Sequence, residues 1–301
     1  MKFFLTIIIS LTGYFACSQE TVVVDAKTKE PLPFATIIMD NAEGFYSNEN
    51  GYINIEKEKF QSITISYLGY KNLELKNIEM KDTIFLTPET IVLKEINISK
   101  NNNPLQRIGF LKRGKQMASF PLQPKKEMII YLFPKPEYAN SYIEQIEFPL
   151  NRVKYYNEKD KLYKNTPAVV RINIYTIENN LPKEKIFSSK PLKFIMSERE
   201  KITLDISDEI IQLSEKGLCF GLEMIGRINE SGEFIEENSS TRPILTDEQS
   251  KEYEAVTYLT DLKKENGFYP LNDVNKKLAK DIKNYKSQDY NLAIGLVIRK
   301  S

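Results

Sequence analysis

The sequence predicts an all-β protein made of two β-sandwiches in series. Apolar and polar residues alternate over short segments such as Ile63–Tyr67 and Lys201–Ile206, as expected for strands with one buried face. Turn-forming residues separate these segments at short intervals. The chain has 301 residues, 41% of them hydrophobic and 28% charged, which is long enough for two globular domains that each bury a core.

Residues 1–18 are expected to form a signal peptide for export. A lysine gives the positive start, Phe3–Leu11 is a short apolar core, and small residues follow at Ala16 and Ser18. Cleavage after Ser18 is favoured, and the alternative is lipidation of Cys17, which would give the protein a lipid anchor. No later stretch approaches the ~20 apolar residues of a membrane-spanning helix, so the protein is not expected to be transmembrane. We expect it in the periplasm, at the outer membrane surface or outside the cell.

Residues 19–99 are expected to form the first sandwich. Two prolines, Pro31 and Pro33, interrupt pairing after the first strand, and Asn48–Gly51 supplies the left-handed backbone of a tight turn. The expected strands are Thr21–Asp25, Ala35–Met39, Gly44–Ser47, Tyr52–Ile55, Ile63–Tyr67, Lys71–Leu75, Thr83–Leu86 and Ile91–Ile98.

These residues also carry a family resemblance. The pattern V-x-D-x-x-T-x-E-P-L-P-x-A-T-I begins at Val23, an Asn-Gly turn follows at Asn50, and S-Y-L-G-Y spans Ser66–Tyr70. Together they resemble the carboxypeptidase-regulatory-like domain over Val22–Ser99. The resemblance implies a transthyretin-like sandwich of seven strands, which precedes another domain in secreted proteins of Gram-negative bacteria, including TonB-dependent transporters. It implies architecture and no peptidase site, because the chain has no histidine.

Residues 100–124 are expected to link the two sandwiches. Lys100–Pro104 is polar and ends in proline, which is typical of a linker. The following segment, Leu105–Pro124, is basic and contains two glycines, so it either wraps one domain or connects both.

Residues 125–301 predict a second, jelly-roll-like sandwich. Val274, Leu278, Ile282 and Tyr285 have helical spacing, so one amphipathic helix is expected over Asp273–Lys286. Parts of the segment between Asn173 and Glu223 are similar to bacterial jelly-roll modules that bind carbohydrate. The expected strands are Met128–Phe133, Tyr142–Leu150, Ala168–Ile177, Leu192–Met196, Ile202–Ile206, Leu218–Ile225, Tyr253–Leu262 and Tyr290–Arg299.

Composition excludes several classes of function. Lysine and arginine number 42 and aspartate and glutamate 41, so no basic surface for nucleic acid is expected. Without histidine, zinc hydrolase sites and Ser–His or Cys–His nucleophile pairs cannot form. Carboxylate pairs or a Ser–Lys arrangement remain, and neither has a recognisable signature here. We therefore predict a protein that is not an enzyme and needs no cofactor.

Candidate binding residues lie in a polar loop of the second sandwich. Tyr155, Tyr156 and Tyr163 are expected to offer an exposed aromatic platform for sugar rings, with Arg152 or Lys154 donating hydrogen bonds to sugar hydroxyls. The alternative is that these tyrosines pack on the end of the sandwich. Cys219, in an apolar segment, is expected to be a buried core residue.

Two short acidic segments are candidates for structural calcium sites. Asn48–Gly51 offers oxygen ligands without the ligand density of a calcium loop, and Asp205, Asp208 and Glu209 lie at a strand end. A turn is the favoured interpretation of both, and calcium the alternative. The prediction for the whole chain is an exported, non-enzymatic binding or scaffolding protein that recognises a glycan or a cell-surface protein. The alternative is an accessory structural subunit of an outer-membrane complex.

Overall fold

The protein is all-β, as the sequence predicted, and it separates into two compact units, the first made by most residues up to Glu89 and the second by most residues after it, with Asn41–Phe45 grouped in the second. The computed structural model describes residues 20–40, 43–55, 60–89, 103–109, 117–118, 122–150, 166–195, 200–237, 242–261, 267–274, 276 and 289–301.

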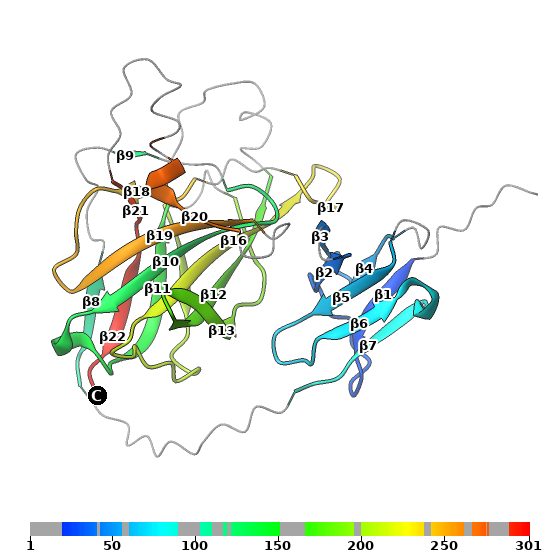
Figure 1. The fold of residues 1–301 in the computed structure, drawn as a ribbon, viewed down its shortest axis with the longest axis horizontal. Coiled ribbons are helices and arrows are strands. Elements are labelled where there is room, and N and C mark those ends of the chain that lie inside the picture. The colour runs from blue at the N-terminus through cyan, green and yellow to red at the C-terminus, as the bar shows by residue number, and fades with distance from the viewer. Residues whose placement is uncertain are drawn as a thin grey trace, which may run out of the picture. The chain divides into compact units, whose positions relative to one another are not determined.

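The first unit is a β-sandwich of two sheets (Figure 1). One sheet has the order β4–β1–β7, with β1 antiparallel to β4 and parallel to β7. The other has the order β3–β2–β5–β6. The elements are β1 (Thr21–Asp25), β2 (Thr36–Met39), β3 (Glu43–Tyr46), β4 (Tyr52–Ile53), β5 (Ser62–Ser66), β6 (Leu73–Lys76), the 3₁₀ helix η2 (Asn77–Glu79) and β7 (Thr83–Leu86).

The core of the first unit comes from the alternation that the sequence showed. Val23 and Ile84 are buried on one sheet, and Ile37, Ile63 and Ile65 are buried on the other. Packing these β-branched side chains between the sheets removes their apolar surface from water, which is the main favourable term in folding. β1 and β7 have the predicted bounds. The predicted strand Ile91–Ile98 lies outside the described residues.

The family motif explains a turn in the first unit. Oδ1 of Asp25 accepts hydrogen bonds from the amides of Lys27 and Thr28, at 2.5 and 3.0 Å. Its Oδ2 accepts one from the hydroxyl of Tyr70 at 2.6 Å. The aspartate of the first motif therefore closes its own turn and is held by the tyrosine of the last motif.

The second unit is a larger β-sandwich. Its eight-stranded sheet has the order β13–β12–β16–β10–β19–β20, with β14 beside β12 and β17 beside β16. The strands of this sheet are β10 (Lys126–Pro134), β12 (Ala168–Glu178), β13 (Leu181–Ser188), β14 (Leu192–Phe194), β16 (Leu218–Ile228), β17 (Phe234–Ile235), β19 (Tyr253–Asp261) and β20 (Phe268–Pro270).

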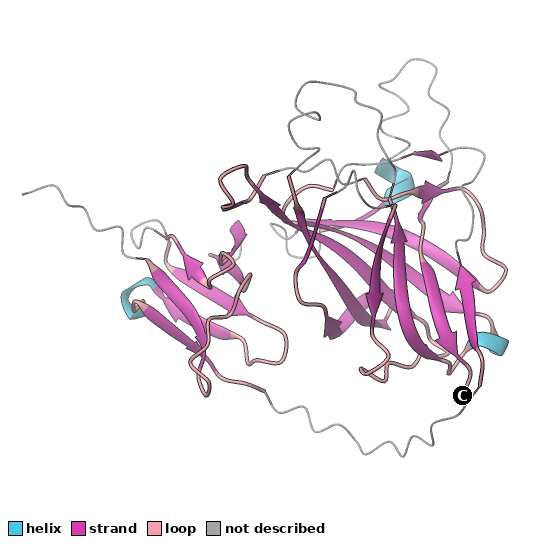
Figure 2. Ribbon diagram, turned by 180° about the vertical axis from the view of Figure 1, so that it is seen from behind, coloured by secondary structure: helices cyan, strands magenta, loops and turns pink. Residues whose placement is uncertain are grey.

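Two smaller sheets complete this unit (Figures 1 and 2). One has the order β15–β11–β22–β8 and the other the order β21–β18–β9. Their strands are β8 (Leu105–Gly109), β9 (Met117–Ala118), β11 (Tyr142–Pro149), β15 (Lys201–Asp205), β18 (Leu245–Thr246), β21 (Asn291–Leu292) and β22 (Gly295–Arg299), and a 3₁₀ helix, η3 (Pro136–Tyr138), precedes β11.

The core lies between the eight-stranded and four-stranded sheets. Ile130, Ile172 and Phe220 of the larger sheet belong to one buried cluster with Phe148 and Leu296 of the smaller sheet. All five side chains are at most 1% exposed. Every second residue of β10, β12 and β16 points into this core, so the residues between them form a second face, which we call the outer face.

Several elements differ from the sequence expectation. β13 was not expected, because most of its side chains are exposed and it shows no apolar alternation. Leu105–Gly109, left open as a wrap or a connection, pairs with β22 as an edge strand. The expected strand Tyr290–Arg299 is two strands, β21 and β22. Residues 271–274 and 276 are helical, close to the start of the expected helix, whose remaining residues are not described.

Candidate functional site

The binding residues expected from sequence lie outside the described residues. Tyr155, Tyr156, Tyr163 and Arg152 all fall within residues 151–165, and the lipidation candidate Cys17 falls within residues 1–19. Their roles remain predictions.

The two candidate calcium segments form turns. Oδ1 of Asn48 accepts hydrogen bonds from the amides of Asn50 and Tyr52, and Gly51 has a left-handed φ of 77°. Oδ1 of Asp205 accepts from the amide and hydroxyl of Ser207 at 3.0 and 2.8 Å, which lowers the pKa of Asp205. In the described part of the chain, no group of three or more acidic or cysteine residues could hold a metal ion.

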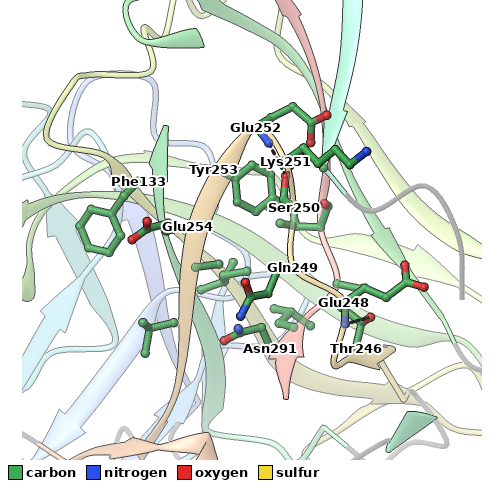
Figure 3. Close-up of a pocket in the computed structure, with 17 residues that line it drawn as sticks. Phe133, Thr246, Glu248, Gln249, Ser250, Lys251, Glu252, Tyr253, Glu254 and Asn291 are labelled. Atoms are coloured by element: carbon green, nitrogen blue, oxygen red, sulfur yellow. Dashed lines mark hydrogen bonds between the residues drawn. The ribbon is translucent and has the colours of Figure 1, made fainter. Parts of the chain in front are cut away.

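A cavity of about 760 Å³ lies beside the first half of β19 (Figure 3). β20 pairs with β19 only over residues 258–260, so the preceding part of β19 is free of that neighbour. The wall is completed by Thr246 and residues 248–252, by residues 291–294, and by Gly109, Ile130 and Phe133.

Short side-chain hydrogen bonds fix the loop that forms the cavity rim. The amide of Glu248 donates to Oγ1 of Thr246 at 3.0 Å. Oγ of Ser250 accepts from the amide of Glu252 at 3.0 Å and donates to the carboxylate of that residue at 2.6 Å. The rim is thus a sequence of Ser/Thr turns, and it presents its other polar side chains to the cavity.

Tyr253 anchors the inner wall of the cavity. Its buried hydroxyl donates to the carbonyl of Ile294 at 2.9 Å. Gly109 lies beside the Tyr253 hydroxyl and the Ile294 carbonyl and has a φ of 90°. A Cβ on Gly109 would lie 2.6 Å from each of these two oxygens. Only glycine fits both the backbone conformation and this close approach.

The cavity combines hydrogen-bonding and apolar side chains. Its apolar surface comes from residues such as Ile130, Phe133 and Leu292. Among the described residues, Oδ1 of Asn291 has no hydrogen-bond partner, and this atom is buried with essentially no surface exposed to the cavity. The polar lining residues are Thr246, Glu248, Gln249, Ser250, Lys251, Glu252, Glu254 and Asn291.

A second polar feature lies on the outer face of the eight-stranded sheet. Strand register aligns its residues in rows across neighbouring strands. The first row is Thr260, Glu127, Glu223 and Arg171. The second is Tyr258, Ile129, Gly221, Asn173 and Ser188. The third is Val256, Tyr131, Cys219, Tyr175 and Lys185.

A hydrogen-bond network connects residues of the first two rows with Tyr175 of the third. Nδ2 of Asn173 donates to Oε1 of Glu127 at 2.8 Å and to Oε2 of Glu223 at 2.9 Å. Tyr175 donates its hydroxyl to the Glu127 carboxylate, and Ser188 donates to Oδ1 of Asn173 at 2.7 Å. Both glutamates are 3% exposed and Asn173 is 0% exposed. The network therefore joins β10, β12, β13 and β16, with its two carboxylates and the Asn173 side chain buried and with Tyr175 and Ser188 partly exposed.

Glycine makes room for this network. A Cβ on Gly221 would lie 1.8 Å from Oε1 of Glu127, so the carboxylate occupies the space above that glycine. Burial, and next the facing carboxylate of Glu223, raise the pKa of Glu127 to about 7. The positive charge of Lys185, and after it the hydrogen bonds from Asn173 and Tyr175, lower the pKa of Glu127.

The third row is aromatic and surrounds a cysteine. The rings of Tyr131 and Tyr258 are 4.8 Å apart, and Tyr131 packs with Cys219 and Ile129. Among the described residues, the buried Tyr131 hydroxyl has no hydrogen-bond partner. Burial raises the pKa of the Cys219 thiol, so the expected core cysteine is buried and protonated, though on the outer face rather than between the sheets.

The sequence contains an indication of this network that is not a catalytic motif, namely charged residues inside apolar strand segments. Arg171 interrupts the apolar run Val169–Ile172, and Glu223 lies between Leu222 and Met224. A charged residue inside an apolar strand is rarely buried without partners. Such residues on adjacent strands therefore indicate a buried polar cluster.

Within the described residues, no helix is long and apolar enough to span a membrane.

Comparison with known proteins gives a structural similarity at low sequence identity. No curated protein matches the chain. A crystal structure of the cysteine protease and lectin-like domains of Cwp84, a surface layer associated protein of Clostridium difficile, is similar with a TM-score of 0.37 and 10% identity. The match covers 65% of this chain and 36% of that one.

The first unit has a clear family assignment. Residues 20–98 match the family model of the CarboxypepD_reg-like domain, which confirms the resemblance seen in the motifs around Asp25 and Tyr70. The N-terminal sandwich of this protein is a CarboxypepD_reg-like domain.

Proposed function

We propose that this protein is an exported, non-enzymatic binding protein whose C-terminal sandwich recognises a carbohydrate in the cavity beside Tyr253. The cavity carries the proposal, because its lining matches the chemistry of a sugar. Its volume lies within the range of about 300–1,000 Å³ that small-ligand sites occupy.

Sugar hydroxyls need donors and acceptors in close succession, and Gln249, Glu248 and Asn291 supply both around the cavity. Phe133 and Val256 give apolar surface for the C–H face of a sugar ring. The hydrophobic segment at residues 1–18 supports export.

Binding of the chain that starts after Ser18 to a glycan array, measured with and without calcium, tests this proposal. We expect selective binding that falls at least tenfold in Gln249→Ala and in Asn291→Ala. Gln123→Ala is the matched control, since Gln123 is exposed and lies outside the cavity. Binding that is unchanged in both cavity variants would overturn the cavity assignment.

The loop predicted from sequence gives a second arm of the same experiment. Loss of glycan binding only in Tyr155→Ala or Tyr156→Ala would move the site to residues 151–165. Silence across the array in the wild-type protein would reject carbohydrate binding and favour a protein partner, which cross-linking in the native envelope would then capture.

A further inference from the structure

Two buried carboxylates face each other on the outer face of the second sandwich. Glu127 on β10 and Glu223 on β16 are direct cross-strand partners. Like charges at such positions repel, and the repulsion is stronger where water is excluded. Among the described residues, the groups that hydrogen-bond to Glu127 are neutral, namely the amide of Asn173 and the hydroxyl of Tyr175.

The charged and titratable groups around Glu127 compensate its charge only partly. Arg171 is the cross-strand partner of Glu223, and its Nη1 lies 3.8 Å from Oε2 of that glutamate. Lys185 on β13 is exposed and lies 5.5 Å from the centre of the Tyr175 ring. Within the described ranges, the other titratable groups that the strand register places on this face are Tyr131 of β10, Tyr175 of β12, Lys193 of β14, Cys219 of β16, and Tyr258 and Glu254 of β19.

We infer that Glu127 and Glu223 form a proton-linked switch: the pair binds one proton on Glu127 at mildly acidic pH, and release of that proton at alkaline pH weakens the joined strands β10, β12, β13 and β16. Protonation of Glu127 removes the repulsion between the facing carboxylates and leaves an acceptor for Asn173 and Tyr175. The raised pKa of Glu127 agrees with this geometry and sets the working range near neutral pH.

The sign of the effect follows from linkage. Because the pKa of Glu127 is higher in the folded than in the unfolded chain, the folded chain binds more protons between the two values. Stability therefore falls as pH rises through this range, with roughly a 10- to 100-fold increase in the unfolding equilibrium constant between pH 5 and pH 8. The chain has no histidine, so no imidazole titrates in the same window.

Denaturant unfolding of the whole chain at pH 5 and pH 8 tests the switch. We expect Glu127→Gln, a neutral isostere of the protonated side chain, to lose most of the pH dependence and to be more stable than wild type at pH 8. Glu147→Gln is the matched control, because Glu147 is also buried but contacts Lys201 and Arg107. It should keep the wild-type pH dependence. An unchanged slope in Glu127→Gln would overturn the inference.

A direct titration of the glutamate carboxyl groups in wild-type protein tests the proposed switch even where a variant fails to fold. In wild-type protein labelled with ¹³C at glutamate Cδ, we expect one carboxyl resonance to titrate near neutral pH. In Glu223→Gln, which removes the facing charge, its midpoint should fall by at least half a pH unit. Glutamate resonances that all titrate below about pH 5.5 in the wild-type protein would refute the switch.

Discussion

Glu127 and Glu223 accept hydrogen bonds from one and the same nitrogen, Nδ2 of Asn173. The two carboxylates come from neighbouring strands, and the amide comes from the strand beyond them. One neutral side chain thus holds two buried acidic groups and ties three strands together on a face that is not part of the main core.

Removal of the shared donor should destabilise the second sandwich. In Asn173→Ala, both carboxylates lose a buried hydrogen bond, so we expect the free energy of unfolding to fall by about 3 kcal/mol. Urea denaturation at pH 7 measures this loss. Gln123→Ala, on the exposed surface, should stay within about 0.5 kcal/mol of wild type. A similar small change in Asn173→Ala would show that the network contributes little.

A side chain at position 221 should destabilise the protein because the Glu127 carboxylate occupies the space above Gly221. Gly221→Ala places a methyl group on the carboxylate, and we expect a loss of about 2 kcal/mol from displaced packing and hydrogen bonds. In a Glu127→Ala background the added methyl group has no carboxylate to meet, so its cost should be much smaller. A double-mutant cycle measures this difference. Equal costs in the two backgrounds would contradict the proposed clash.

The Asp25–Tyr70 hydrogen bond should govern the acid stability of the first sandwich. The pKa of Asp25 is lowered by the Tyr70 hydroxyl and then by the amides of Thr28 and Lys27, and burial raises the pKa of Tyr70 to about 12. A lowered carboxyl pKa stabilises the fold above the unfolded value of about 3.9, and this contribution is lost as pH falls through the folded value.

Tyr70→Phe should therefore raise the pKa of Asp25 and move acid unfolding of the first sandwich to higher pH. Carboxyl NMR titration and circular dichroism follow the two effects. Tyr52→Phe is the control, since Tyr52 is 40% exposed. An unchanged Asp25 titration in Tyr70→Phe would assign the lowered pKa to the backbone amides alone.

Glu147 should hold two cations together on the four-stranded sheet. It is 7% exposed and contacts Arg107, and Lys201 donates to it at 2.7 Å. In Glu147→Ala the two cations are left side by side, and we expect a loss of about 2 kcal/mol in the free energy of unfolding. Since salt screens repulsion between exposed cations, denaturation in 0.5 M NaCl, about a 4 Å Debye length, should show a smaller loss. A loss that grows with salt would contradict this account.

The alternation of apolar and polar residues was sufficient to predict strands that face a sandwich core. It failed for an edge strand, whose side chains are mostly exposed. β1 and β7, with β-branched residues facing a core, were predicted with their bounds. β13 was missed because it is an edge strand whose exposed side chains carry no periodic pattern. Its position is set by pairing with β12, which is a long-range relationship.

The candidate sites could not be read from the sequence, for a related reason. Glu127 and Asn173 are 46 positions apart, and only the order β12–β16–β10 brings them within hydrogen-bond distance. The cavity likewise joins Gly109, Tyr253 and Asn291 from three distant segments. Local patterns predict which face of a strand is buried, whereas the strand order decides which polar residues meet there.

The buried thiol of Cys219 gives this protein an internal reporter of its own opening. Because its raised pKa keeps it protonated and no surface of it is exposed, a thiol reagent can react only when the sheet around it separates. The rate of alkylation in a chain that starts after Ser18 therefore measures how often the second sandwich opens, without any added label.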